Sequence, residues 1–172
     1  MSPTSPVELD DLRRAVQAGA HDRALSVPVP DALADPDAEV VRVTYRAVSF
    51  EAIGERARAI AECDAALARL HDAAAIGRIQ VCAAAIAEHA GQSDEAQTRL
   101  GVAVTAFGRA SRAHGRSSWL EQSRAWAMVE RARLLRRLGR PQEAERLESA
   151  GRRALEAHGV APMAATPATL AS

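Results

Sequence analysis

The sequence contains few aromatic residues, no lysine and no long apolar segment. Aromatic side chains make up 3% of its 172 residues, and the β-branched and aromatic runs typical of strands are scarce. All 22 basic residues are arginine, and they balance 22 acidic residues, so the formal net charge is zero. A β-sheet core is therefore disfavoured, and no overall charge draws the chain to nucleic acid or to an anionic membrane.

Cysteine is also scarce. The two cysteines, Cys63 and Cys82, match no zinc-binding or redox spacing, so we expect buried, reduced thiols. The N-terminal residues MSPTSPVELDD contain neither the basic nor the apolar region of a signal peptide. The sequence has no run of about 18 apolar residues, the length that a membrane span needs. We therefore expect a cytoplasmic protein.

Small aliphatic residues, above all alanine, are abundant. Hydrophobic residues make up 48% of the chain, and a chain of this length is typical of one domain with a substantial core. Small side chains allow helix axes to approach one another closely. The composition therefore favours an all-α protein built from closely packed helices.

A spaced pattern of small residues recurs along the chain. At Gly54, Gly91 and Gly139, an alanine follows the glycine five residues later. A further small residue lies seven positions before each glycine, and another lies twelve positions after it. The three sets are Ala47, Gly54, Ala59 and Ala66; Ala84, Gly91, Ala96 and Ala103; and Ala132, Gly139, Ala144 and Gly151. This recurrence indicates an internal repeat.

A weaker fourth copy precedes these three. It is centred on Gly19 and Ala24, and Pro28 and Pro30 interrupt its second helix. From this copy onward, the glycines are spaced 35, 37 and 48 residues apart. We expect each unit to be a pair of antiparallel helices, in which the glycine ends the first helix and the small residues lie where the backbones touch. Because one pair cannot bury its apolar face alone, the pairs are expected to stack.

This pattern resembles the tetratricopeptide repeat over roughly residues 38–158. The resemblance implies an all-α, right-handed helical-hairpin solenoid with about three repeats and about seven long helices. Residues 1–37 would then form a degenerate N-terminal helical segment and a proline-rich linker packed on the stack. Residues 159–172, which are small and uncharged, are expected to be disordered. The sequence departs from the family where Val43 and Phe50 replace its usual Trp and Tyr, so we interpret it as a divergent, long-helix member.

Residues that favour helix starts agree with the repeat. The predicted starts are Ser5 with Glu8 and Ser118 with Glu121 as capping boxes, Asp35 and Asp72 as N-caps, and Pro141 as a first helical residue. The helix that begins at Ser118 is expected to run to Leu138.

The sequence shows no catalytic, cofactor-binding or metal-binding constellation. Its histidines are His21, His71, His89, His114 and His158, and no two of them have the spacing of a helical metal site. It contains neither a Gly-x-Ser-x-Gly motif nor a phosphate-binding glycine loop. We therefore expect a protein that is not an enzyme and needs no cofactor, although catalysis by residues distant in the sequence stays open.

Charge is distributed unevenly along the chain. Residues 1–64 have a balance of −5, and residues 109–153 have a balance of +7. Five arginines fall within ten residues: Arg131, Arg133, Arg136, Arg137 and Arg140. One interpretation is a solvated helix face paired with nearby glutamates, and the other is a patch for carboxylate or phosphate groups. Nucleic acid is disfavoured as a partner because aromatic residues for base stacking are missing.

The resemblance also implies where a partner binds. Tetratricopeptide repeats usually bind peptides on a concave face that the first helix of each repeat lines. The corresponding residues here are Val41, Val48, Arg78, Val81, His89, Trp126, Val129, Arg133, Arg136 and Arg137. This surface suits a protein or peptide segment with apolar anchors and acidic groups. Trp126 is either an anchor or a packing residue against the neighbouring helix, and Trp119 is either a staple at its helix start or a dimer contact.

The function predicted from these features is a non-catalytic interaction or adaptor module of a bacterial signalling system. It would bind a peptide segment or another copy of itself, and it would bind neither nucleic acid nor membrane. Similar repeat arrays in actinobacterial signalling proteins precede a cyclase or a DNA-binding domain, and the sequence shows neither after residue 158. The alternative is a sensor of a small acidic ligand, or a small biosynthetic enzyme, whose pocket Trp126, His89 and Arg133 would line. A third hypothesis is a self-associating structural bundle.

Overall fold

The protein is all-helical. The computed structural model describes residues 6–30, 32–115 and 117–159, and within these ranges it contains eight helices and no strand. Helix accounts for 81% of the described residues. The all-α prediction is confirmed. No helix within the described ranges has the length and the apolar character that crossing a membrane requires.

The chain divides into two compact units, Met1–Leu70 and His71–Ser172. The first unit contains α1 (Pro6–Gln17), α2 (His21–Ser26), α3 (Pro36–Ala52) and α4 (Arg56–Leu67). The second contains α5 (Ala73–His89), α6 (Ser93–His114), α7 (Ser118–Arg137) and α8 (Pro141–Ala157). The boundary between the units lies inside the repeat domain expected for residues 38–158. Apart from Gly159, the expected tail lies outside the described residues.

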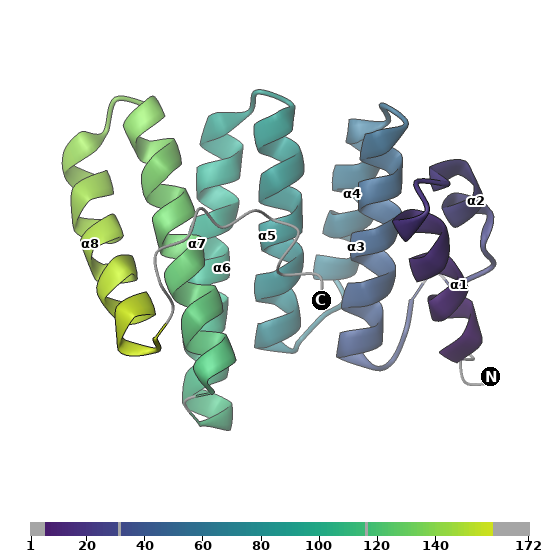
Figure 1. Cartoon of the computed structure of the whole chain (residues 1–172), viewed down its shortest axis with the longest axis horizontal. Coiled ribbons are helices and arrows are strands. Elements are labelled where there is room, and N and C mark those ends of the chain that lie inside the picture. The colour runs from purple at the N-terminus through teal and green to yellow at the C-terminus, as the bar shows by residue number, and fades with distance from the viewer. Residues whose placement is uncertain (1–5, 31, 116, 160–172) are drawn as a thin grey trace. The chain divides into compact units, whose positions relative to one another are not determined.

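Helices that follow one another in sequence pack together as antiparallel hairpins. In the first unit, α3 packs on α4, while α1 and α2 pack on each other and on α3. In the second unit, α5 packs on α6, α6 on α7, and α7 on α8 (Figure 1). The two long hairpins α5–α6 and α7–α8 therefore pack together, with α6 and α7 as the helices that join one hairpin to the next.

The repeated glycines end the first helix of each pair in the same way. Gly19, Gly54, Gly91 and Gly139 all have positive φ, between 70° and 86°, a conformation that glycine adopts without a steric penalty. At the last of these turns, the Gly139 N–H donates to the Arg136 carbonyl (3.1 Å) and the Arg140 N–H donates to the Leu135 carbonyl (2.9 Å). The other three turns contain the same pair of bonds, which is the Schellman arrangement. The prediction for these glycines is confirmed.

The small residues of the repeat lie at helix contacts, as predicted. The alanines at these positions are all buried: Ala47, Ala59, Ala66, Ala84, Ala96, Ala103, Ala132 and Ala144. At Gly151 of α8, an added Cβ would lie 2.9 Å from the backbone oxygen of Ala125 in α7. Because real Cβ atoms do not come so near a backbone oxygen, only glycine fits between these two helices.

Most of the predicted helix starts are confirmed. The Asp35 side chain accepts from the Asp37 N–H at the start of α3, and the Asp72 side chain accepts from the Ala75 N–H at the start of α5. Pro141 is the first residue of α8. Helix α1 begins at Pro6, while the capping serine expected before it lies outside the described residues.

The capping box predicted at Ser118 is wrong. Ser117 is the N-cap of α7, its side chain makes no capping bond, and the helix ends at Arg137. Glu121 instead accepts a 2.5 Å hydrogen bond from the hydroxyl of Ser111, a buried residue of α6. A bond between helices therefore replaces the local one, because the buried hydroxyl needs a partner more than an exposed helix start does.

The first unit contains a buried ion network. Glu39 accepts from the Arg42 Nε and Nη2 atoms at 2.8 Å and 2.9 Å, and both side chains are 3% exposed. Arg42 also donates to Glu62 of α4 at 2.5 Å, and Arg69 donates to Glu39 at 3.1 Å. The network thus joins α3 to α4, and its central pair, Glu39 and Arg42, is almost completely buried. A buried ion pair is favourable only while each charge keeps its partner.

Burial and hydrogen bonding act on Glu39 in opposite directions. Burial raises the pKa of its carboxyl, but the hydrogen bond and the charge of Arg42 lower it by more, helped by the Leu33 N–H and by Arg69. The pKa therefore lies below its ordinary value of 4.5. Glu39 is ionised at neutral pH although it is buried.

The two cysteines lie in different environments. Cys63 of α4 is fully buried, Cys82 of α5 is half-buried, and neither is part of a disulfide. Burial is thus complete for one of the two expected buried thiols and partial for the other.

Candidate interaction surface on α5 and α7

The ten predicted partner-binding residues fall in both units. Val41 and Val48 belong to α3 of the first unit. Val41 is half-buried, and Val48 is one of the exposed large hydrophobic residues, at 36%. The other eight residues belong to α5 and α7 of the second unit: Arg78, Val81, His89, Trp126, Val129, Arg133, Arg136 and Arg137.

Helices α5 and α7 run side by side in the same direction. Near their beginnings, the Arg78 guanidinium of α5 lies 5.8 Å from the ring centroid of Trp119 in α7. Near their ends, Glu88 of α5 accepts from Arg133 and Arg137 of α7. Because contacts join the two helices at both ends, their facing sides form one surface, which we call the α5/α7 surface.

The apolar residues of this surface differ in exposure. Val81 is buried at 7% exposure, so it belongs to the core of the unit. Trp126 and Val129 are half-buried. The indole Nε1 of Trp126 is itself buried and has no hydrogen-bond partner among the described residues. Trp126 thus packs partly within the unit and remains partly accessible.

The carboxylate of Glu88, near the end of α5, accepts hydrogen bonds from two arginines of α7. The Arg133 Nη1 and Nη2 atoms donate to the two Glu88 oxygens at 2.6 Å each, a bidentate pair. The Arg137 Nη1 atom donates to the same carboxylate at 2.7 Å, and the Arg133 Nε atom donates to Glu130 at 2.8 Å. We call these four residues the Glu88 network.

The bidentate pair shifts the pKa values of Glu88 and Arg133. The hydrogen bond from Arg133 lowers the pKa of Glu88 most, burial raises it, and the charges of Arg133 and Arg137 lower it further, with a net decrease. The hydrogen bond to Glu88 correspondingly raises the pKa of Arg133. Glu88 and Arg133 are therefore both charged at neutral pH, and their bidentate pair joins α5 to α7.

The remaining arginines of the basic stretch also have partners. Arg136 forms an ion pair with Glu148 of α8, which also accepts from Arg152 at 2.6 Å. Arg140 pairs with Glu143 at 2.7 Å, and Arg131 donates to Gln97 of α6 at 3.3 Å. These contacts correspond to the first of the two interpretations, a helix face paired with nearby glutamates.

Trp119 and His89 lie at opposite ends of the α5/α7 surface. Trp119 is 42% exposed and packs edge-on against Phe107 of α6, with ring centroids 6.1 Å apart and an interplanar angle of 87°. This contact fixes the first turn of α7 and leaves one side of the indole accessible. His89 is the last residue of α5, and it is exposed.

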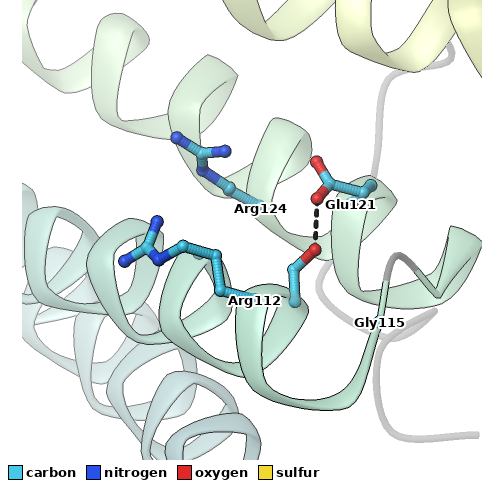
Figure 2. A pocket seen from close by; sticks show the side chains of 6 residues that line it. Arg112, Gly115, Glu121 and Arg124 are labelled. Carbon is cyan, nitrogen blue, oxygen red and sulfur yellow. Dashed lines mark hydrogen bonds between the residues drawn. The ribbon is translucent and has the colours of Figure 1, made fainter.

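A cavity between α6 and α7 contains none of the predicted residues. Its volume is about 440 Å³, and its lining comprises Gly108, Ser111, Arg112, Gly115, Glu121 and Arg124 (Figure 2). Sequence reasoning missed it because Arg112 and Arg124 lie on different helices on either side of a turn. The excess of arginine in residues 109–153 was the available signal, but it does not say which arginines meet.

Comparison with protein-family models, with curated proteins and with solved structures found no match. Within the described ranges, no three histidine, cysteine, aspartate or glutamate side chains are grouped so that they could hold a metal ion.

Proposed function

We propose that the chain is a non-catalytic interaction module, built of tetratricopeptide-like helical hairpins, that binds a protein segment on the α5/α7 surface. The α5/α7 pairing carries this proposal. Two first helices of successive hairpins lie parallel, and they bring apolar and charged side chains onto one face. The repeated glycine turns and the buried small residues support the tetratricopeptide-like assignment.

The surface suggests the chemistry of the bound segment. Trp126, Val129 and the accessible side of Trp119 offer apolar contacts, and large aromatic residues are frequent hot spots of binding. The Arg137 side chain is 57% exposed and uses one nitrogen on Glu88, so its other donors face solvent. A segment with an apolar anchor and a nearby carboxylate therefore fits this surface best.

Peptide display on the full-length chain tests this proposal. Selected peptides should be enriched in apolar residues next to Asp or Glu. The Arg137→Glu variant should bind them about tenfold or more weakly, because a charge-assisted hydrogen bond is lost and a like charge is introduced. Arg153→Glu, on the exposed side of α8, is the matched control and should bind as wild type does.

Two results would count against the proposal. One is the absence of any peptide that the chain retains better than an unrelated helical protein does. The other is an equal loss of binding in the Arg137→Glu and Arg153→Glu variants, which would show that net charge and not the α5/α7 surface attracts the peptides. Sedimentation of the chain alone distinguishes a bound segment from a second copy, since self-association would occupy the surface without any peptide.

A further inference from the structure

We propose that the cavity between α6 and α7 binds a small phosphorylated molecule, with Arg112 and Arg124 holding its phosphate group. This goes beyond the interaction surface described above, and the cavity shares no residue with that surface. It also shares no residue with the pocket that Trp126, His89 and Arg133 were expected to line.

The two arginines of the cavity differ from those of the basic stretch between residues 131 and 140. Arg133, Arg136, Arg137 and Arg140 each have a carboxylate partner. Among the described residues, neither Arg112 nor Arg124 forms an ion pair. The Nε of Arg124 is buried and lacks a hydrogen-bond partner in the part of the chain that the structure describes. A buried donor without an acceptor destabilises the fold, so an oxyanion that accepts a hydrogen bond from this Nε would remove that penalty.

The two guanidiniums face the same space above Gly108. A Cβ on this glycine would lie 3.4 Å from the Arg124 Nε and 3.7 Å from the Arg112 Nη1. Two like charges that share this space without a carboxylate between them repel each other, and an anion placed there would neutralise both. Because Gly108 has no side chain, this space stays open.

The acidic residue of the cavity does not neutralise the arginines. Glu121 accepts from the Ser111 hydroxyl at 2.5 Å, and Figure 2 shows the two guanidiniums pointing away from this pair. The lining therefore has one positive charge in excess. It also has two regions, a cationic end at Arg112 and Arg124 and a polar end at Ser111 and Glu121.

The size and the charge of the cavity favour a phosphomonoester. A volume of about 440 Å³ falls within the usual range for small-molecule pockets and leaves room for more than an inorganic ion. A single guanidinium satisfies a carboxylate, whereas two guanidiniums suit the three terminal oxygens and the double charge of a phosphate. The Ser111 and Glu121 end could accept hydrogen bonds from hydroxyl groups of the same molecule.

Calorimetric titration of the full-length chain tests the site, with phenyl phosphate as the probe and benzoate as its carboxylate analogue. Phenyl phosphate should bind with 1:1 stoichiometry and at least about tenfold more tightly than benzoate. Inorganic phosphate should compete with it. Arg112→Gln and Arg124→Gln should each weaken binding about tenfold or more, because each removes a charged donor.

Arg109→Gln is the control, because it removes the same charge from an exposed position on α6 outside the cavity. It should leave the affinity unchanged. Thermal unfolding shows that each variant is folded. The proposal is overturned if phenyl phosphate does not saturate the protein, if benzoate binds equally well, or if inorganic phosphate does not compete. It is also overturned if Arg109→Gln weakens binding as much as the two cavity variants do.

Discussion

Each unit of the protein has a glutamate that gathers arginines, and the two glutamates differ mainly in burial. Glu39 and Arg42 in the first unit are each 3% exposed. Glu88, Arg133 and Arg137 in the second are 21%, 38% and 57% exposed. The ion pairs are chemically alike, but they differ in how far they are exposed to solvent. A buried pair is costly to break, whereas a half-exposed pair can exchange its partners with water or with a ligand.

The largest effect is expected from removing the buried carboxylate. Glu39→Gln leaves Arg42 buried beside a neutral side chain, and breaking such a pair typically costs about 3–5 kcal/mol. Chemical denaturation, followed by hydrogen exchange of amides in α3, measures the loss. Glu55→Gln, which removes the partner of Arg58 on the surface, is the control and should cost no more than about 1 kcal/mol. Equal effects would mean that burial does not set the strength of the Glu39 network.

Acid should remove the same contribution from the wild type. The folded-state pKa of Glu39 is lowered, so its contribution to stability is complete above the unfolded-state pKa of about 4.3. It is lost as the pH falls through the lower folded-state pKa. The difference in unfolding free energy between wild type and Glu39→Gln should therefore narrow as the pH decreases below about 4. Denaturation curves of both proteins at several acidic pH values measure this difference. If the difference widened in acid, the pKa of Glu39 would be raised in the folded state and not lowered.

The next effect compares two glycines inside helices of the second unit. Gly151→Ala places a methyl group against the Ala125 carbonyl of α7, and such overpacking typically costs about 1–3 kcal/mol. At Gly101 of α6, the atoms nearest to a new Cβ belong to the flexible end of the Arg131 side chain. Gly101→Ala should therefore stabilise the helix by up to about 1 kcal/mol. Thermal unfolding of both variants measures the two changes in stability. If both substitutions stabilised the protein, α7 and α8 would have to separate easily.

The smallest effect on stability is expected at Glu88. Glu88→Gln should cost no more than about 1 kcal/mol, because its partners are half-exposed and water can replace the lost bonds. The same change should strengthen the binding of acidic peptides to the α5/α7 surface, since Arg133 and Arg137 lose their internal counter-charge. Thermal unfolding and a peptide titration measure the two quantities. A loss of stability as large as that of Glu39→Gln would remove the distinction between the two networks.

Local features of the fold were predictable from the sequence. Gly54, Gly91 and Gly139 end helices because each adopts a positive φ there, which glycine does without a steric penalty. The glycines are visible in the sequence, so these helix ends can be predicted from it. Asp35 and Asp72 cap helices through atoms two or three residues away. Such interactions need only neighbouring residues, and single-sequence patterns are therefore sufficient to find them.

Interactions between helices were not predictable to the same degree. The sequence shows five arginines in one stretch, but the partner of Arg133 lies 45 residues earlier, at Glu88. The prediction at Ser118 was wrong because Glu121 accepts a hydrogen bond from the Ser111 hydroxyl of another helix. The cavity depends on Arg112 and Arg124 meeting across a turn, which is a property of packing. The periodicity of apolar residues in a sequence predicts which face of a helix is buried. It does not predict which charged residues of different helices form ion pairs.

The pattern of helix packing has a consequence for how the chain folds. In the second unit, the main packing partners of each helix are its neighbours in sequence, so the loops closed during folding are short. Folding is rapid when contacts are local, and domains generally form in order as a chain is synthesised. We expect the hairpin α5–α6 to gain hydrogen-exchange protection while α7 and α8 are still being made. Pulse labelling of ribosome-stalled chains, in which residue 115 has just left the exit tunnel and α7 is still inside it, would show protected α5 amides if this is so. The α5 amides would be unprotected if α7 is required.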